Sequence, residues 1–178
     1  MIPQRSYFLK TERLGFAQWT PDDLPLAMGL WGDPKFTRLL GGPFSEEEVK
    51  ERLAREIDSM ARSGIQYWPI FWIADGDLVG CAGVHPYKPE ARIFELGFHL
   101  RPAYWGNGLA FEASQAIIKL AFGGLGAAAL FAGHHPSNAA SKRVLERLGF
   151  RFTHEELYPP TGLMNPSYLL AAEPECPR

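Results

Sequence analysis

Two glycines spaced two residues apart, Gly106 and Gly108, lie between a strand-like apolar run and a helix-like run in the stretch RPAYWGNGLAFEA. Glycine lets the main chain approach a ligand without a Cβ in the way, and the first N–H groups of a helix lack partners within the helix. The helix N-terminus also carries a partial positive charge. This junction could therefore bind a phosphate or diphosphate through peptide groups alone, although an isolated G-x-G pair is also compatible with a tight connection that binds no ligand.

Named residues exclude the common nucleotide and metal sites. A Rossmann site would need a third glycine at position 111, which is Phe111, and an acidic residue near the end of the following strand, where His134 and His135 occur. A Walker loop would need G-x-x-x-x-G-K, which the sequence lacks. Adjacent histidines on a strand point to opposite faces, and no Cys or Asp cluster accompanies them, so we expect no metal site.

Glu95 is a lone carboxylate in the apolar run RIFELGFHL. Partial burial would raise its pKa from about 4.3 toward the range that suits a base near neutral pH. The alternative is a structural carboxylate that pairs with a neighbouring arginine or accepts a hydrogen bond from a backbone amide. His85 and His99 could also exchange protons near neutral pH.

The first half of the chain predicts strands and two helices. Residues 8–19 predict one strand, and Thr20 followed by Pro21 predicts a helix to about Trp31. A second helix is predicted over residues 46–63, with a Ser45 and Glu48 capping box and Gly64 as its stop. Residues 65–87 predict two strands around the turn Asp75-Gly76-Asp77, where Pro69 indicates an edge position or a bulge.

The second half alternates strands and helices. Residues 92–100 predict a strand near the sheet centre with both faces covered, because apolar residues occur at both parities. The remaining elements are a helix from Leu109 to Gly123, a strand at 127–135, a helix capped by Ser137 or Asn138 that stops at Gly149, and strands at 150–158 and 167–173. We therefore predict one α/β or α+β domain over residues 1–178, with a single mixed, largely antiparallel sheet and about four helices.

Composition limits the partners. The 178 residues contain 18 Lys and Arg against 20 Asp and Glu, a net charge of −2, so no basic excess attracts nucleic acid or anionic membranes. The cysteines Cys81 and Cys176 form no disulfide framework, which favours a reducing cytoplasm. No apolar stretch approaches the roughly 20 residues of a spanning helix, and the N-terminus lacks the apolar core of a signal peptide.

The run ELGFHLRPAYWGNGLAFEA, followed by HPSNAASKRVLERLGFRF, resembles the GNAT superfamily of acetyl-CoA-dependent N-acetyltransferases. Within it, the chain is similar to the Rim-type branch that contains ribosomal-protein acetyltransferases, and the N-terminal LKTERLGFAQWTPDD and GDPKFTRLLGGPFSEEE segments share that similarity. The resemblance covers nearly the whole chain. It implies a sheet that splays apart at ELGFHL, with the thioester and pantetheine arm of acetyl-CoA in the opening.

The resemblance also implies where acetyl-CoA is held, as a co-substrate and without a metal. The pantetheine arm is expected to bond main-chain groups of one strand and the asparagine that heads a later helix, and the diphosphate is expected to meet the N–H groups of the glycine turn. The residues concerned are Phe98, His99, Leu100, Trp105, Gly106, Asn107, Gly108, Leu109, Ala110, Asn138 and Ser141. Ala103 occupies a position where many relatives have Gln or Arg, and Arg101 could compensate or could be a solvent-exposed side chain.

Acetyl transfer from a thioester to an amine requires a neutral amine, stabilisation of the oxyanion and a proton donor for the leaving thiolate. The resemblance favours Glu95 as the general base, acting directly or through water. Many relatives use a tyrosine as the acid, but the corresponding residue is Leu145, so that role is not carried over. Ser141 matches a serine that recurs in the Rim-type branch, and its hydroxyl could bond the sulfur or only cap the helix.

The family builds its acceptor pocket from the segments that correspond to residues 31–44 and 158–166. Trp31, Phe36 and His85 are the candidate substrate-binding residues. We therefore expect a cytoplasmic monomer or homodimer that moves acetyl to a small-molecule or peptide primary amine by direct transfer in a ternary complex. The alternatives are an acyl-CoA-binding sensor or pseudoenzyme without transferase activity, and an interaction domain whose glycine turn binds nothing.

Overall fold

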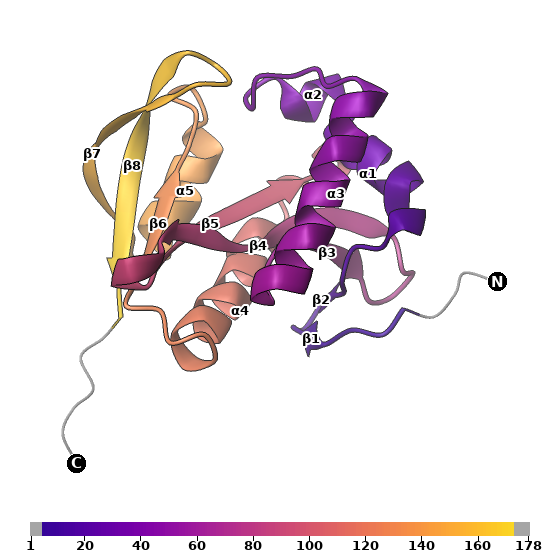
Figure 1. Cartoon of the computed structure of the whole chain (residues 1–178), viewed down its shortest axis with the longest axis horizontal. Coiled ribbons are helices and arrows are strands. Elements are labelled where there is room, and N and C mark those ends of the chain that lie inside the picture. Colours follow the sequence, from indigo (N-terminus) through magenta and orange to yellow (C-terminus); the bar gives the residue numbers. More distant parts are fainter. Residues whose placement is uncertain (1–4, 173–178) are drawn as a thin grey trace.

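The computed structural model describes residues 5–172, which form one mixed sheet of eight strands in the order β1-β2-β3-β4-β5-β6-β8-β7 (Figure 1). The strands are β1 (Leu9–Lys10), β2 (Leu14–Phe16), β3 (Tyr67–Trp72), β4 (Leu78–Lys88), β5 (Ile93–Leu100), β6 (Ala129–Gly133), β7 (Arg151–Tyr158) and β8 (Leu163–Ala171). The α-helices are α1 (Leu24–Trp31), α2 (Pro34–Thr37), α3 (Glu46–Ser63), α4 (Leu109–Gly123) and α5 (Ala139–Arg147), with 3₁₀ turns at Pro21–Asp23, Pro89–Ala91 and Pro102–Tyr104. The predicted single mixed sheet is confirmed.

Local signals explain most of these boundaries. The Ser45 and Glu48 capping box begins α3, and Gly64 ends it with a left-handed φ of 71°. The Asp75-Gly76-Asp77 turn joins β3 to β4, as predicted. Pro69 lies in an interior strand, one residue before a register shift at Ile70 and Phe71, so the bulge alternative holds rather than the edge.

Three boundaries differ from the prediction. Residues 8–19 do not form one strand, because the N–H of Thr11 donates to the carbonyl of Leu14 at 2.9 Å and turns the chain back between β1 and β2. The short helix α2 was not predicted; Asp33 caps it by accepting from the N–H of Lys35. Strand β8 begins at Leu163, before the predicted start.

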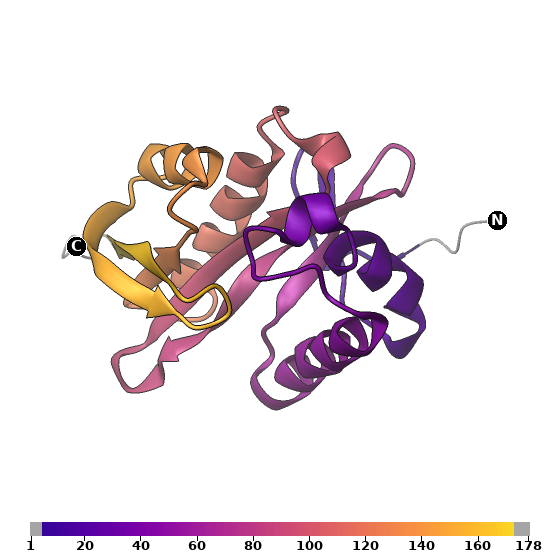
Figure 2. The same cartoon turned by 90° about the horizontal axis from the view of Figure 1, so that it is seen from above.

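The sheet is covered on both faces, with α1, α2 and α3 on one side and α4 and α5 on the other (Figure 2). Leu96 and Leu100 of β5 pack with Ile117 of α4 in one core cluster. Tyr67 of β3 and Cys81 of β4 pack with helices α1 and α3 in the second cluster. On β5 itself, Leu96 and Leu100 are buried against α4, whereas Glu95, Gly97 and His99 on the other face are only half-buried, so the predicted cover of both faces is complete on one face alone.

The sheet splays apart between β5 and β6. The two strands are parallel and pair only from Ile93 opposite Ala129 to Glu95 opposite Phe131. Strand β5 continues to Leu100, paired with β4 alone. The backbone edge of β5 beyond Glu95 therefore faces an opening, where the family resemblance placed it.

Among the described helices, none is both long enough and apolar enough to cross a membrane. Cys81 is fully buried, and Cys176 lies outside the described residues.

Candidate active site

The glycine turn presents main-chain groups at the N-terminus of α4. Gly106 and Gly108 have φ values of 78° and 75°, which favour glycine, and Gly108 is the N-cap of the helix. Trp105 through Gly108 are exposed, whereas Leu109 is buried and anchors the first turn in the core. The N–H groups from Gly106 to Ala110 are thus available to donate to an anion. The N–H of Trp105, which was predicted to join them, instead donates to the carbonyl of Pro102 at 3.2 Å.

An ion pair and several hydrogen bonds from a segment near the N-terminus hold the glycine turn in place. Glu112, in the first turns of α4, accepts from the hydroxyl of Thr11 at 2.5 Å, the N–H of Arg13 at 3.0 Å and the Nε of Arg13 at 2.7 Å. Arg13 Nη1 also donates to the carbonyl oxygen of Asn107 at 3.1 Å. Burial acts to raise the pKa of Glu112, but these hydrogen bonds and the charge of Arg13 outweigh it and lower that pKa. The positioning roles of Thr11, Arg13 and Glu112 were not predicted from the sequence.

The strand register decides which main-chain groups of β5 face the opening. The N–H of Arg101 donates to the carbonyl of Val79 at 2.9 Å, and Leu100 lies opposite Gly80. Along an antiparallel strand, the main-chain N–H and C=O of successive residues point alternately toward one neighbouring strand and toward the other side. Phe98 and Leu100 therefore direct these groups away from β4, and His99 directs them toward β4. The carbonyl of Leu100 accepts from Trp105 Nε1 at 2.7 Å, so the indole lies at one end of the open edge.

The start of α5 carries the predicted asparagine and serine. Asn138 is the N-cap, and its Oδ1 accepts from the N–H of Ser141 at 3.1 Å. Ser141 is half-buried. Leu145, at the position where many relatives have the tyrosine that acts as general acid, is 1% exposed and belongs to the core.

Glu95 lies opposite His85 in the β4–β5 ladder, so both side chains project from the same face of the sheet. Glu95 is half-buried. Burial raises its pKa, the charges of His85 and Arg52 act to lower it, and Glu156 acts to raise it, with a net upward shift. This is the direction that suits a base working near neutral pH.

His85 is held by α3. Its Nε2 lies 3.2 Å from a carboxylate oxygen of Glu56, and its ring centroid lies 4.4 Å from that of Tyr67. Glu56 is 4% exposed and also accepts from the N–H of Tyr67 at 2.8 Å. Glu56 was not predicted from the sequence, although its place in the buried stripe of α3 with Leu53 was a usable signal.

His99 packs among aromatic rings on the same face. Its ring centroid lies 5.3 Å from that of Phe36 and 5.6 Å from that of Tyr67, and Cys81 Sγ lies 3.8 Å from its Nδ1. Burial holds the pKa of His99 well below its ordinary value, and the positive charges of Arg52 and His85 act in the same direction. His99 is therefore neutral, and its side chain forms part of the aromatic wall on this face of the sheet.

The two predicted acceptor segments meet over this face, where the loop after α2 approaches the β7–β8 turn (Figures 1 and 2). A Cβ placed on Gly41 would lie 2.6 Å from the carbonyl oxygen of Pro160. Phe36 is 9% exposed and reaches His99, whereas Trp31 is 0% exposed and packs on Trp19, in a second layer. Burial raises the pKa of Tyr158 at the end of β7, Arg52 opposes this shift, and the charge of Glu95 adds to it.

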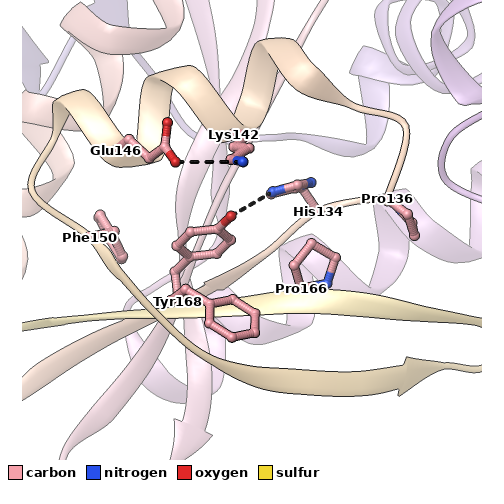
Figure 3. A pocket seen from close by; sticks show the side chains of 8 residues that line it. His134, Pro136, Lys142, Glu146, Phe150, Pro166 and Tyr168 are labelled. Atoms are coloured by element: carbon pink, nitrogen blue, oxygen red, sulfur yellow. Dashed lines mark hydrogen bonds and ion pairs between the residues drawn. The ribbon is translucent and has the colours of Figure 1, made fainter.

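A separate cavity of about 380 Å³ lies between α5 and the β7–β8 hairpin (Figure 3). His134, Lys142, Glu146 and Tyr168 contribute polar atoms to it, and His134 Nε2 lies 3.4 Å from the Tyr168 hydroxyl. None of the predicted site residues lines it. Within residues 5–172, no group of three or more His, Cys, Asp or Glu side chains is arranged to hold a metal ion.

Known proteins share this architecture. The family model of the acetyltransferase (GNAT) domain matches residues 13–151. The N-acetyltransferase YoaA of Bacillus subtilis is 28% identical over 148 residues, covering 80% of this chain and 82% of YoaA. The FsC-acetyl coenzyme A-N(2)-transacetylase of Aspergillus fumigatus is 28% identical over 172 residues, covering 87% of this chain and 71% of the relative.

Among solved structures, RimL, an alpha-N-acetyltransferase of a ribosomal protein, has a TM-score of 0.79 at 17% identity and covers 94% of both chains. A likeness at this identity shows the fold. Members of the matched family generally use acetyl-CoA. The open β5 edge, the glycine turn and the family match together lead to one conclusion: the chain belongs to the GNAT acetyltransferase family and is an N-acetyltransferase.

Proposed function

We propose that the protein transfers the acetyl group of acetyl-CoA to a primary amine by direct attack in a ternary complex. One observation carries the proposal. Strand β5 places an open main-chain edge at Phe98 and Leu100 next to Glu95, a half-buried carboxylate with a raised pKa. A co-substrate lying along that edge would bring its reactive end to the base.

The residues present fit acetyl-CoA, which when bound supplies an activated thioester. Phe98 and Leu100 would hold the amide-rich pantetheine arm as an added strand holds its neighbour. His99, which was predicted to bind the arm with them, directs its main-chain groups to β4 and would contribute only its side chain to the wall of the site. The N–H groups from Gly106 to Ala110 would bind the diphosphate, and Asn138 would bond the arm from α5.

The acceptor must lose a proton to react. An alkyl ammonium with a pKa near 10 is almost wholly protonated at neutral pH, so Glu95 would take the proton, directly or through water. The amine nitrogen then forms a bond to the thioester carbon as the carbon–sulfur bond breaks, and the sulfur leaves with the electron pair. The nitrogen loses its second proton as the amide forms, and the sulfur gains a proton through solvent, so that coenzyme A leaves as the free thiol. The Ser141 hydroxyl would hydrogen-bond the departing sulfur, because buried Leu145 offers no proton donor.

The Rim-type branch is the finer part of the proposal. Tyr104 and Trp105 before the glycines and the GDPKF segment at α2 support it, and RimL shares the fold. By this assignment the acceptor is a small-molecule or peptide amine. The cytoplasmic location and the monomer or homodimer stay predictions from the sequence.

The test combines coenzyme A binding with turnover. Calorimetry on the purified protein should detect coenzyme A binding and a rise in thermal stability. With acetyl-CoA and a panel of amines, free thiol should appear only when an accepted amine is present. Binding without turnover on any amine would favour the acyl-CoA sensor, and no binding at millimolar coenzyme A would contradict both functions.

A further inference from the structure

One face of α3 projects toward β4 and β5. Arg52, Glu56 and Ser59 recur at helical spacing on that face. Glu56 and Ser59 contact His85, at 3.2 Å and 3.5 Å. Arg52 lies one turn earlier, and its Cζ is 4.7 Å from the ring centroid of Trp31.

In the described part of the chain, the guanidinium of Arg52 lacks a hydrogen-bond acceptor at its Nε. Its Nε is shielded from solvent and finds no hydrogen-bond partner within residues 5–172. The indole Nε1 of Trp31, the ring beside it, is also buried without a partner in the same part of the chain. A ring face attracts the cation but accepts no in-plane N–H bond, and a buried donor left without an acceptor is destabilising. The Nε of Arg52 is thus a shielded donor for which the described residues supply no acceptor.

The nearby carboxylates of the described residues accept no hydrogen bond from Arg52. Glu56 accepts from the N–H of Tyr67 and lies beside His85. Glu95 forms no ion pair with Arg52 within 4.0 Å among the described residues, although the charge of Arg52 acts on Glu95 and also on Tyr158. Arg52 is thus a half-buried positive charge one helical turn before Glu56, which contacts His85 opposite Glu95 in the sheet.

We propose that Arg52 binds a carboxylate carried by the amine acceptor, so that the substrates are amino acids or related amines with a free carboxylate. The inference rests on the proposed function and names its substrate class. Arginine suits this role because its planar fork of N–H donors matches a carboxylate and keeps its charge at every working pH. The amine of the same molecule would then face Glu95.

Matched substrate pairs test the inference. Initial rates of thiol release would be measured for α-, β- and γ-amino acids and for the corresponding amides, in which an uncharged group of similar size replaces the carboxylate. The wild-type protein should prefer the acid of at least one pair in kcat/KM, and the preferred chain length reports the spacing between Arg52 and Glu95. Since an amide also lowers the pKa of the neighbouring amine, the acid-to-amide ratio is compared between wild type and variant, where that intrinsic difference cancels.

The variant is Arg52→Gln, and Arg55→Gln is its matched control. Arg55 belongs to the same helix and is 70% exposed, so its loss removes the same charge outside the site. Arg52→Gln should lower kcat/KM for the preferred acid roughly 10- to 100-fold, chiefly through KM, with little change for its amide, since one charge-assisted contact is lost. Arg55→Gln should leave kcat/KM unchanged for both the acid and its amide. If Arg52→Gln does not fold, Arg52→Lys retains the charge without the fork and should still reduce the acid preference.

The outcomes separate the two levels of the proposal. Turnover of amines with no preference for the acids, or an equal loss on acid and amide in Arg52→Gln, overturns the carboxylate site and leaves the acetyltransferase assignment intact. Absence of turnover on every amine, together with absence of coenzyme A binding, overturns the proposed function and this inference with it.

Discussion

Glu95 shows how one residue can be adapted to a task by its surroundings. Its strand is central, so the carboxylate is half-buried and its pKa rises. His85 on the neighbouring strand moderates that rise, and Glu56 fixes His85 in turn. A free carboxylate with a raised pKa accepts a proton more readily than an ordinary glutamate does.

Replacement of Glu95 tests the base directly. Glu95→Gln should lower kcat/KM about 100-fold or more near neutral pH, because general base catalysis is lost. In the wild type, activity should rise as Glu95 deprotonates, at a pH above the usual glutamate value because its pKa is raised. This rise of kcat/KM with pH should disappear in Glu95→Gln, in which kcat/KM would depend only on the fraction of the acceptor amine that is neutral. The measurement is a pH profile of kcat/KM.

Glu156→Gln is the control for this experiment. It removes an exposed carboxylate whose charge helps to raise the pKa of Glu95. Turnover should persist, with the rise of kcat/KM moved to lower pH. Near-normal turnover of Glu95→Gln above about pH 8, where more of the amine is neutral, would rule out Glu95 as the base.

At the residue scale, the sequence predicted Glu95 and the glycine turn but not Arg52 or Glu56. The first two are unusual in their local surroundings: one is a charge in an apolar strand and the other is a bare turn before a helix. Arg52 and Glu56 are polar residues on a helix rich in charges, and only the packing of α3 on β4 distinguishes them from the exposed ones. Which face of a helix meets which strand depends on tertiary contacts.

The element that matters most is the turn into α4. Its two glycines have positive φ, and a Cβ on Gly106 would meet no atom within 4 Å, so glycine is needed there for its backbone conformation rather than for space. The same holds for Gly108, whose nearest atom is Arg13 Nη2 at 3.9 Å.

Gly108→Ala should therefore distort the anion-binding N–H groups without a steric clash. A left-handed alanine costs about 1–2 kcal/mol, and relaxation of the turn should weaken coenzyme A binding roughly tenfold. Isothermal calorimetry on both proteins measures this. Gly123→Ala in the last turn of the same helix, which also has open space but no positive φ, is the control and should keep its affinity. Equal affinity of Gly108→Ala and wild type would show that the turn conformation does not matter for binding.

Elements with explicit start and stop signals were predictable. Helix α3 follows from its capping box and Gly64, and the β3–β4 hairpin follows from its turn. The prediction of one strand over residues 8–19 was wrong, because the turn at Thr11 is made by hydrogen bonds to Leu14 and contains no glycine or proline. Helix α2, only four residues long, is too short to show periodicity.

Across the whole molecule, contacts between distant segments position the site. Arg13 near the start of the chain binds Glu112 and the carbonyl of Asn107, and the loop at Gly41 meets Pro160. Neither pairing leaves a local signal in a single sequence. The order and direction of the strands, and therefore the splay between β5 and β6, were accessible only through the family resemblance.

The Arg13 and Glu112 contact should contribute to global stability in a pH-dependent way. The pKa of Glu112 is lowered in the folded protein, so its contribution is present above the unfolded pKa of about 4.3 and is lost as the pH falls through the folded value. Glu112→Gln should lower the free energy of unfolding by about 1–2 kcal/mol at pH 7, a value reduced for the partly exposed Arg13. The deficit relative to wild type should shrink in acid.

Urea unfolding at neutral and acidic pH measures both parts of this prediction. Glu51→Gln, which removes an exposed carboxylate 3.9 Å from Arg55, is the control and should change stability little. A deficit in Glu112→Gln that stays constant down to low pH would mean that packing, rather than the ionised carboxylate, accounts for the loss.

The one-sided pairing of β5 beyond Glu95 also divides its amide hydrogens into two kinds. His99 directs its N–H into the ladder with β4, whereas Phe98 and Leu100 direct theirs into the opening. In deuterated solvent the free protein should exchange the second kind fast and the first kind slowly, so that neighbouring amides on one strand differ. A ligand in the opening would slow exchange at Phe98 and Leu100, so the exchange rates of these two amides report whether the opening is occupied, without any turnover of substrate.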